Sequence, residues 1–184
     1  IVEYKFEDLN DVELGDWERK GGKGAVINIP NGFLPNDAHL IEIKPGGKSA
    51  PEKHMYEEVM YVVSGRGATS VWLSEGQKAT FEWAAGSLLV IPLNATYQHF
   101  NGSGAEPARY VSMTNAPPTL RMFRSTDFVF NNDFTFTDRF SGEDEDFFNG
   151  QGTLYRRKGT KFGTMWKTNF VPNADIMKLW QYRD

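Results

Sequence analysis

A chain of 184 residues that is 40% hydrophobic and 14% aromatic is long enough, and apolar enough, for one domain or for one domain with an extension. Its formal net charge of −4, without a cluster of lysine and arginine, argues against a nucleic-acid partner. The lack of cysteine excludes disulfides, thiolate nucleophiles and cysteine-ligated zinc. No apolar run approaches the roughly 18 residues of a membrane span and nothing resembles a signal peptide, so we expect no membrane partner and a cytoplasmic location.

Residues 1–24 are interpreted as an N-terminal arm. The following stretch consists of short runs of β-branched and aromatic residues separated by Gly, Pro and Asn, which is typical of an all-β protein. Seven strands are predicted, at residues 38–43, 57–63, 67–73, 78–83, 87–91, 96–100 and 108–114. A tight hairpin turn is predicted at residues 64–67 (SGRG), because glycine readily adopts positive φ. Strands at this spacing predict a jelly roll or small barrel, and residues 25–115 are assigned to it.

Residues 116–184 have a different composition and are interpreted as a C-terminal extension. Eight phenylalanines occur between residues 123 and 148. The alternation of Phe128 with Phe130, and of Phe134 with Phe136, predicts an apolar strand face that packs against the outer surface of the barrel. A subunit or domain interface is the alternative, because many exposed aromatic side chains need to be covered.

Two stretches carry most of the residues suited to chemistry. The first, PEKHMYEEVMYVVSGRG at residues 51–67, contains Glu52, His54 and Glu58; the second, GSLLVIPLNATYQHFN at residues 86–101, contains Tyr97 and His99. These stretches resemble the two motifs of the cupin superfamily. His54 stands where the second histidine of the first motif belongs, Glu58 at its glutamate, and Glu52 replaces its first histidine. In the second motif Tyr97 occupies the histidine position, with His99 two residues beyond.

Other positions of the motifs agree with this resemblance. Gly65 and Gly86 match their glycines, and Asn101 matches the last asparagine of the second motif. Asn94 replaces a glycine, and asparagine tolerates the left-handed conformation better than other residues with a side chain. The resemblance implies a cupin jelly-roll barrel, followed by a segment similar to the linker of a two-barrel cupin.

If His54 and Glu58 bind one metal ion, their spacing in the sequence requires a turn between them. In an extended chain His54 and Glu58 would stand roughly 13 Å apart, too far to bind one ion. Residues 55–57 must therefore turn, and Glu58 then shares an inward face with Met60 and Val62. Tyr97 and His99 share the inward face of another strand.

The resemblance implies a metal site with His54, Glu58 and His99 as ligands and Glu52 as a fourth. Two imidazoles and a carboxylate with open positions suit Fe or Mn, and also Zn or Ni. We expect Tyr97 to orient a substrate or donate a proton. Three further residues are predicted to line the pocket: Met60, Val62 and His39, which shares a face with Ile41 and Ile43.

Three functions remain open from the sequence. The first is a divalent-metal-dependent oxidoreductase, dioxygenase-like, that acts on a small organic substrate. The second is a metal-free isomerase or epimerase with Tyr97 and a histidine as its acid–base pair. The third is a metal-free or degenerate barrel with a binding, structural or assembly role, whose activity resides in a partner barrel. A homo-oligomer or a second cupin barrel is the macromolecular partner that the resemblance implies.

Overall fold

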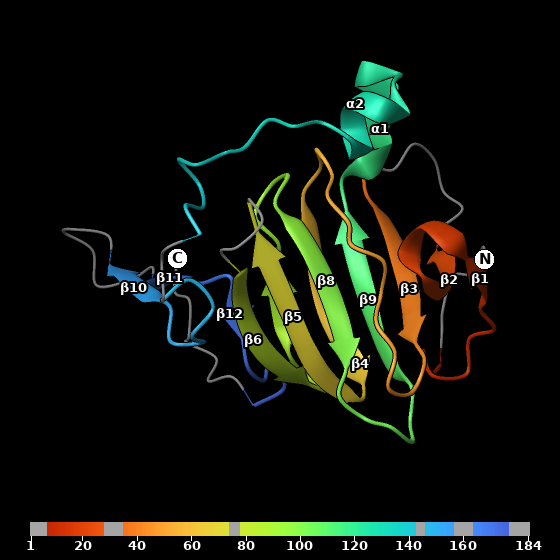
Figure 1. Ribbon diagram of the computed structural model, residues 1–184. Coiled ribbons are helices and arrows are strands. Elements are labelled where there is room, and N and C mark those ends of the chain that lie inside the picture. Colours follow the sequence, from red (N-terminus) through yellow and green to blue (C-terminus); the bar gives the residue numbers. More distant parts are fainter. Residues whose placement is uncertain (1–6, 28–34, 74–77, 143–145, 157–163, 177–184) are drawn as a thin grey trace.

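The computed structural model describes residues 7–27, 35–73, 78–142, 146–156 and 164–176 (Figure 1). Two strands and a 3-10 helix precede the predicted barrel, and two α-helices and three short strands follow it. The elements are β1 (Gly15–Trp17), η1 (Glu18–Lys20), β2 (Gly22–Ile27), β3 (Asp37–Ile43), β4 (Glu58–Ser64), β5 (Arg66–Trp72), β6 (Lys78–Ala84), β7 (Leu88–Val90), β8 (Thr96–Asn101), β9 (Ala108–Thr114), α1 (Ala116–Phe123), α2 (Thr126–Phe130), β10 (Thr153–Arg156), β11 (Thr164–Lys167) and β12 (Phe170–Val171).

The predicted β architecture is confirmed, and each of the seven predicted strands is present with both ends within one residue. A large antiparallel sheet has the strand order β1-β2-β3-β9-β4-β7-β12, and a smaller one the order β6-β5-β8. The smaller sheet lies in front of the larger one in Figure 1, so that the two form the layers of a jelly roll. Strand β2 begins inside the segment interpreted as an arm and pairs with β3.

The core lies between the two sheets and follows the alternation of the strands. Glu58, Met60 and Val62 on β4 point inward and are buried, as their spacing predicts. Tyr97 and His99 on β8 are also buried. Glu58 from the large sheet and Tyr97 and His99 from the small sheet thus bring polar groups into the interior.

The turn at residues 64–67 differs from the prediction. Gly65 has a φ of 88°, so its left-handed conformation is as expected. However, β4 pairs with β7 and β9, whereas β5 pairs with β6 and β8. The turn therefore carries the chain from one sheet to the other instead of closing a hairpin. Asn94, with a φ of 56°, adopts the left-handed conformation predicted for it.

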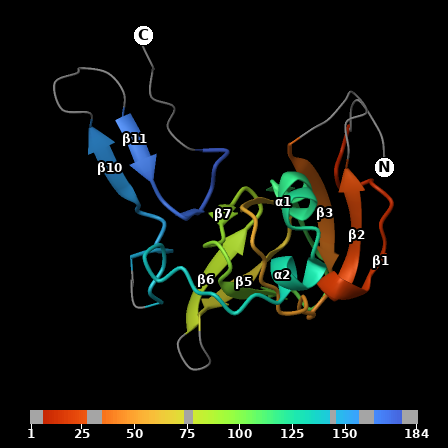
Figure 2. The ribbon, with the colours of Figure 1, turned by 90° about the horizontal axis from the view of Figure 1, so that it is seen from above.

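The prediction of a strand face at Phe128 and Phe130 is wrong, because both residues belong to helix α2. The side chain of Ser125 caps this helix by accepting a hydrogen bond from the backbone N–H of Phe128, and this local bond favours helix over strand. Helices α1 and α2 lie together over one end of the barrel in Figures 1 and 2. Backbone N–H of Met55 donates to the carbonyl of Val129, which ties α2 to the loop before β4.

The C-terminal extension packs onto the barrel through aromatic side chains. Phe140, Phe148 and Phe170 belong to the same buried cluster as Phe81 of β6. The rings of Phe81 and Phe148 are stacked with centroids 4.4 Å apart. Strand β12 adds to the edge of the large sheet beside β7. Within the described residues, every helix is too short or too polar to span a bilayer.

Candidate functional site

The structure brings His54, Glu58 and Tyr97 together inside the barrel. Nε2 of His54 lies 2.8 Å from Oε2 of Glu58, and the hydroxyl of Tyr97 donates to the same carboxylate oxygen over 2.8 Å. The Tyr97 hydroxyl is also 3.3 Å from Nε2 of His54. The bend at residues 55 and 56 makes this approach possible, as the spacing of the two ligand candidates requires.

Both ring nitrogens of His54 face hydrogen-bond acceptors. Nδ1 lies 2.8 Å from the backbone carbonyl oxygen of Tyr56, and Nε2 faces the carboxylate of Glu58. A carbonyl oxygen can only accept, so Nδ1 donates to Tyr56, while Nε2 faces both the carboxylate of Glu58 and the hydroxyl of Tyr97. The ring also stacks on Tyr56, with centroids 3.7 Å apart and planes 3° from parallel. His54 is thereby fixed as a donor in this arrangement.

A lysine that the sequence analysis did not identify completes the cluster. Lys20 belongs to η1, and its side chain is fully buried. Its Nζ lies 3.0 Å from Oε2 of Glu52 and 3.9 Å from Oε1 of Glu58. The closer contact lacks hydrogen-bond geometry and is an ion pair. Arg19 contacts Glu52 from the outer side, with Nη1 2.7 Å from Oε2.

Backbone contacts hold the residues of this ion cluster in place. The N–H and carbonyl groups of Glu52 and Tyr97 bond to each other, over 2.9 and 2.8 Å. Backbone N–H of Ala50 donates to the carbonyl of Lys20. Gly21 follows with a φ of 68°, and a Cβ there would lie only 2.5 Å from the nitrogen of Ala50. The glycine therefore allows the N-terminal segment to approach the barrel closely enough for Lys20 to enter it.

The charges of the cluster stabilise one protonation pattern. Burial by itself would raise the pKa of Glu58, but the charge of Lys20 and the hydrogen bond from His54 outweigh it and hold this pKa well below its usual value. Burial and the nearby carboxylates of Glu58 and Glu52 raise the pKa of Tyr97 well above its usual value. Glu58 is therefore an ionised acceptor and Tyr97 a protonated donor.

His99 belongs to a separate hydrogen-bond chain. Its Nδ1 lies 2.6 Å from the hydroxyl oxygen of Thr69, which also accepts a hydrogen bond from the indole N–H of Trp83. Either Thr69 or His99 can supply the proton of this bond, and Nε2 of His99 has no hydrogen-bond partner among the described residues. Burial lowers the pKa of His99 to about 3, so its ring is neutral. The structure thus places His99 near Tyr97, with ring centroids 5.2 Å apart, but not in its network.

The three residues predicted to line the pocket are all buried. Met60 and Val62 are part of the apolar core. His39 lies on the inner side of β3, where its Nε2 is 3.1 Å from Asp37 and its ring contacts Trp17 edge-on.

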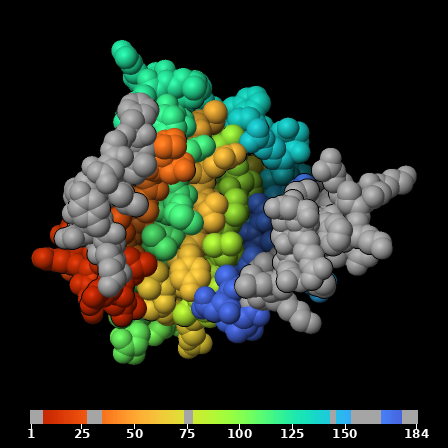
Figure 3. Space-filling model, turned by 180° about the vertical axis from the view of Figure 1, so that it is seen from behind, coloured from red at the N-terminus to blue at the C-terminus, as the bar shows by residue number. Residues whose placement is uncertain are grey.

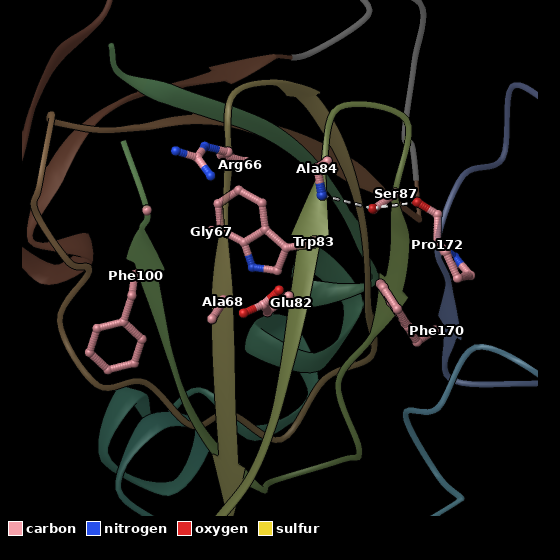
Figure 4. A pocket seen from close by; sticks show the side chains of 11 residues that line it. Arg66, Gly67, Ala68, Glu82, Trp83, Ala84, Ser87, Phe100, Phe170 and Pro172 are labelled. Atoms are coloured by element: carbon pink, nitrogen blue, oxygen red, sulfur yellow. Dashed lines mark hydrogen bonds between the residues drawn. The ribbon is translucent and has the colours of Figure 1, made fainter. Parts of the chain in front are cut away.

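Two cavities lie near the cluster without reaching its centre. One, of about 380 Å³, opens between α2 and the loop before β4, and Arg19 and Glu52 form part of its wall. The other, of about 560 Å³, lies on the smaller sheet and is shown in Figure 4. The indole of Trp83 forms part of its lining, and the N–H of this indole donates a hydrogen bond to Thr69. Neither cavity is lined by His54, Glu58, Tyr97 or His99.

The resemblance implies a divalent metal, and the side chains can be tested for it. In the described parts of the chain no three His, Asp or Glu residues are arranged to hold an ion. Nε2 of His54 lies 2.8 Å from Oε2 of Glu58, so these two candidate ligand atoms contact each other in this arrangement. The carboxylates of Glu52 and Glu58 already share the ammonium group of Lys20. The residues in this arrangement do not fit a divalent ion.

Lys20 and Arg19 could not be identified as site residues from the sequence. The pair Gly21-Gly22 after Lys20 is the one local signal, since it allows a close approach of the backbone. No spacing rule connects an N-terminal lysine to Glu52 and Glu58, because the contact depends on how the segment folds back over the barrel.

Comparisons with known proteins give one family match and several similar solved structures. Residues 39–114 match the family described as "Cupin domain". Among solved structures, the oxalate decarboxylase of Lactobacillus farciminis is 29% identical over 58% of this chain and 32% of that chain, with a TM-score of 0.49. The Bacillus subtilis oxalate decarboxylase is 23% identical over 58% of this chain and 28% of its own, with a TM-score of 0.48. Hazelnut (Corylus avellana) vicilin is 19% identical over 52% of this chain and 29% of its own, with a TM-score of 0.46.

The chain thus spans about a third or less of the length of these solved relatives. Manganese(II) centres are described for the Bacillus subtilis enzyme. No curated protein matches the chain.

Proposed function

Residues 39–114 of the chain are a cupin domain, and we propose that this domain works as a metal-free barrel with a structural and assembly role. The observation that carries the proposal is the position of Lys20. Its ammonium group supplies a positive charge between the buried carboxylates of Glu52 and Glu58, so their charges are balanced by the chain itself.

Burial of the network supports the same function. Lys20, Glu52, His54, Glu58 and Tyr97 are all almost fully buried, and α1 and α2 lie over one end of the barrel. A dioxygenase-like reaction with Fe or Mn would require Lys20 to withdraw and His54 to leave Glu58. Metal-free acid–base chemistry by His54 and Tyr97 would require a substrate to pass Arg19 and Glu52, which lie at the wall of the nearer cavity.

The first prediction concerns the metal content of the purified chain. We expect far less than one equivalent of Mn, Fe, Co, Ni or Zn by elemental analysis, and an unchanged melting temperature when Mn(II), anaerobic Fe(II) or Co(II) is added. A ligand that binds only the folded state would raise the melting temperature, so an unchanged value reports the lack of a site. One tightly held ion per chain, removed by chelation with a fall in melting temperature, would refute the proposal.

A separate feature supports the assembly role. Val59 and Tyr61 on β4 face outward beside Met113 and Val111 on β9. These side chains are half-buried, except that Met113 is 53% exposed. Figure 3 shows this face of β9, β4 and β7 open to view. We propose that a second copy of the chain covers it, because a twofold axis through the strip would place the same apolar side chains on both partners.

Sedimentation velocity tests this interface. We expect the wild-type chain to form a dimer at micromolar concentration and Met113→Lys to weaken the dimer by at least about tenfold, since it buries a charge at the centre of the strip. Met122→Lys is the matched control, because Met122 lies on α1 and is 75% exposed. A monomeric wild type, or equal effects of the two substitutions, would exclude this dimer.

A further inference from the structure

We propose that Lys20 is a built-in cation that takes the place of a divalent ion in this barrel, and that its removal converts the cluster into a metal site. The inference rests on the metal-free function proposed above and explains how one residue enforces it. It concerns a residue outside both sequence motifs, in a segment that precedes the cupin domain.

The first support is that the position of Lys20 is determined by its backbone. The carbonyl of Lys20 accepts a hydrogen bond of 3.0 Å from the backbone N–H of Ala50. Gly21 lies so close to Ala50 that a side chain at position 21 would not fit. Arg19 is directed to the other side, where it binds Glu52 and lies 4.6 Å from the ring of Phe130. The two neighbouring cations therefore approach Glu52 in different ways, and only Lys20 enters the interior.

The second support is a set of buried polar atoms in the cluster and on the neighbouring His99. Oε1 of Glu52, Oε1 of Glu58 and Nε2 of His99 are buried and have no hydrogen-bond partner among the described residues. The ring centroid of His99 lies 5.2 Å from that of Tyr97, whose hydroxyl donates to Glu58, so His99 is connected to the cluster through Tyr97. Carboxylate oxygens and an imidazole nitrogen are the donors that first-row divalent ions bind. The chain retains donors of this type, and the monovalent cation Lys20 contacts the two carboxylates among them.

The third support is the electrostatic consequence of removing Lys20. Without Lys20, Glu52 keeps only Arg19 and Glu58 keeps only its contacts with His54 and Tyr97, so the buried negative charge favours a new cation or a proton. Lys20→Ala also removes the side-chain volume and leaves room for an ion beside Glu52 and Glu58. With Lys20 in place, an added divalent ion would meet an ammonium group at the same carboxylates and be repelled.

Titration with Mn(II) and Co(II), followed by calorimetry and by Co(II) absorption spectra, tests the inference. We expect Lys20→Ala to bind about one ion per chain at least about tenfold more tightly than the wild type, with new Co(II) absorption bands. Arg19→Ala is the control, since it removes a cation from Glu52 but leaves Lys20, and we expect no gain. Adding Glu58→Gln to Lys20→Ala should abolish the gain, which would locate the ion.

Folding of the variant does not obscure the result. If Lys20→Ala is unfolded alone but folds when Mn(II) or Co(II) is added, the inference is supported, because metal binding is then coupled to folding. If it remains unfolded with each ion, or folds and binds no more tightly than the wild type, the inference is overturned. Stoichiometric metal in the wild type would instead overturn the proposed metal-free function.

Discussion

Glu58→Gln is expected to lower the free energy of unfolding by about 3–5 kcal/mol at pH 7, as removal of one partner from a buried ion pair generally does. Glu58 is fully buried and accepts hydrogen bonds from Tyr97 and His54 at one oxygen. Its other oxygen lies 3.9 Å from the ammonium group of Lys20. Loss of the negative charge leaves Lys20 and His54 buried with Glu52 as the one remaining carboxylate of the cluster. Urea unfolding of both proteins measures the difference.

The pH dependence of this difference has a defined sign. The pKa of Glu58 in the folded protein lies well below the ordinary 4.5, so the carboxylate stabilises the folded state at pH values above 4.5. That stabilisation is lost as the pH falls from 4.5 through the folded-state pKa. The stabilities of wild type and Glu58→Gln should therefore converge in acid.

The control is Asp133→Asn, which breaks an ion pair with Lys53 at the surface. Oδ1 of Asp133 lies 3.3 Å from the Lys53 ammonium, and the Asp133 side chain is fully exposed. Solvent screens such a pair, so no measurable change is expected. If the two substitutions had equal effects, Glu58 would not hold the charge network together.

The sequence predicted those parts of the fold that depend on local alternation. Val62, Met60 and Glu58 share the inner face of β4 because side chains alternate along any strand, and the same rule placed Tyr97 and His99. The turn at Gly65 was also recognisable, but a turn does not show which strands pair on either side of it. Sheet membership depends on contacts with β7 and β9, which come later in the chain.

The errors have a similar origin. Phe128 and Phe130 alternate like strand residues, but the cap at Ser125 and the packing of Val129 against Tyr56 and Ala116 select a helix. The motif residues His54 and Glu58 were placed correctly relative to each other, and their partner Lys20 was missed. A buried ion cluster combines residues from distant segments, and its composition follows only from the folded chain.

The Phe-rich extension contributes to stability by packing, independently of the buried ion cluster, and this contribution can be measured. Phe140 is 1% exposed and contacts Phe147 and Phe148, and Phe148 stacks on Phe81 of the barrel. Phe134 lies six residues earlier and is 60% exposed. The same segment therefore contains a core phenylalanine and a surface phenylalanine, which permits a matched comparison.

Phe140→Ala is expected to lower the free energy of unfolding by about 3–5 kcal/mol, because it removes a large buried side chain and leaves a cavity. Phe134→Ala should change it by less than about 1 kcal/mol, as is usual for exposed positions. Urea unfolding of the two variants, with wild type as reference, gives both values. A single cooperative transition for Phe140→Ala would show that extension and barrel unfold together. If Phe140→Ala were as stable as Phe134→Ala, the extension would not be part of the core, and the barrel would be stabilised without it.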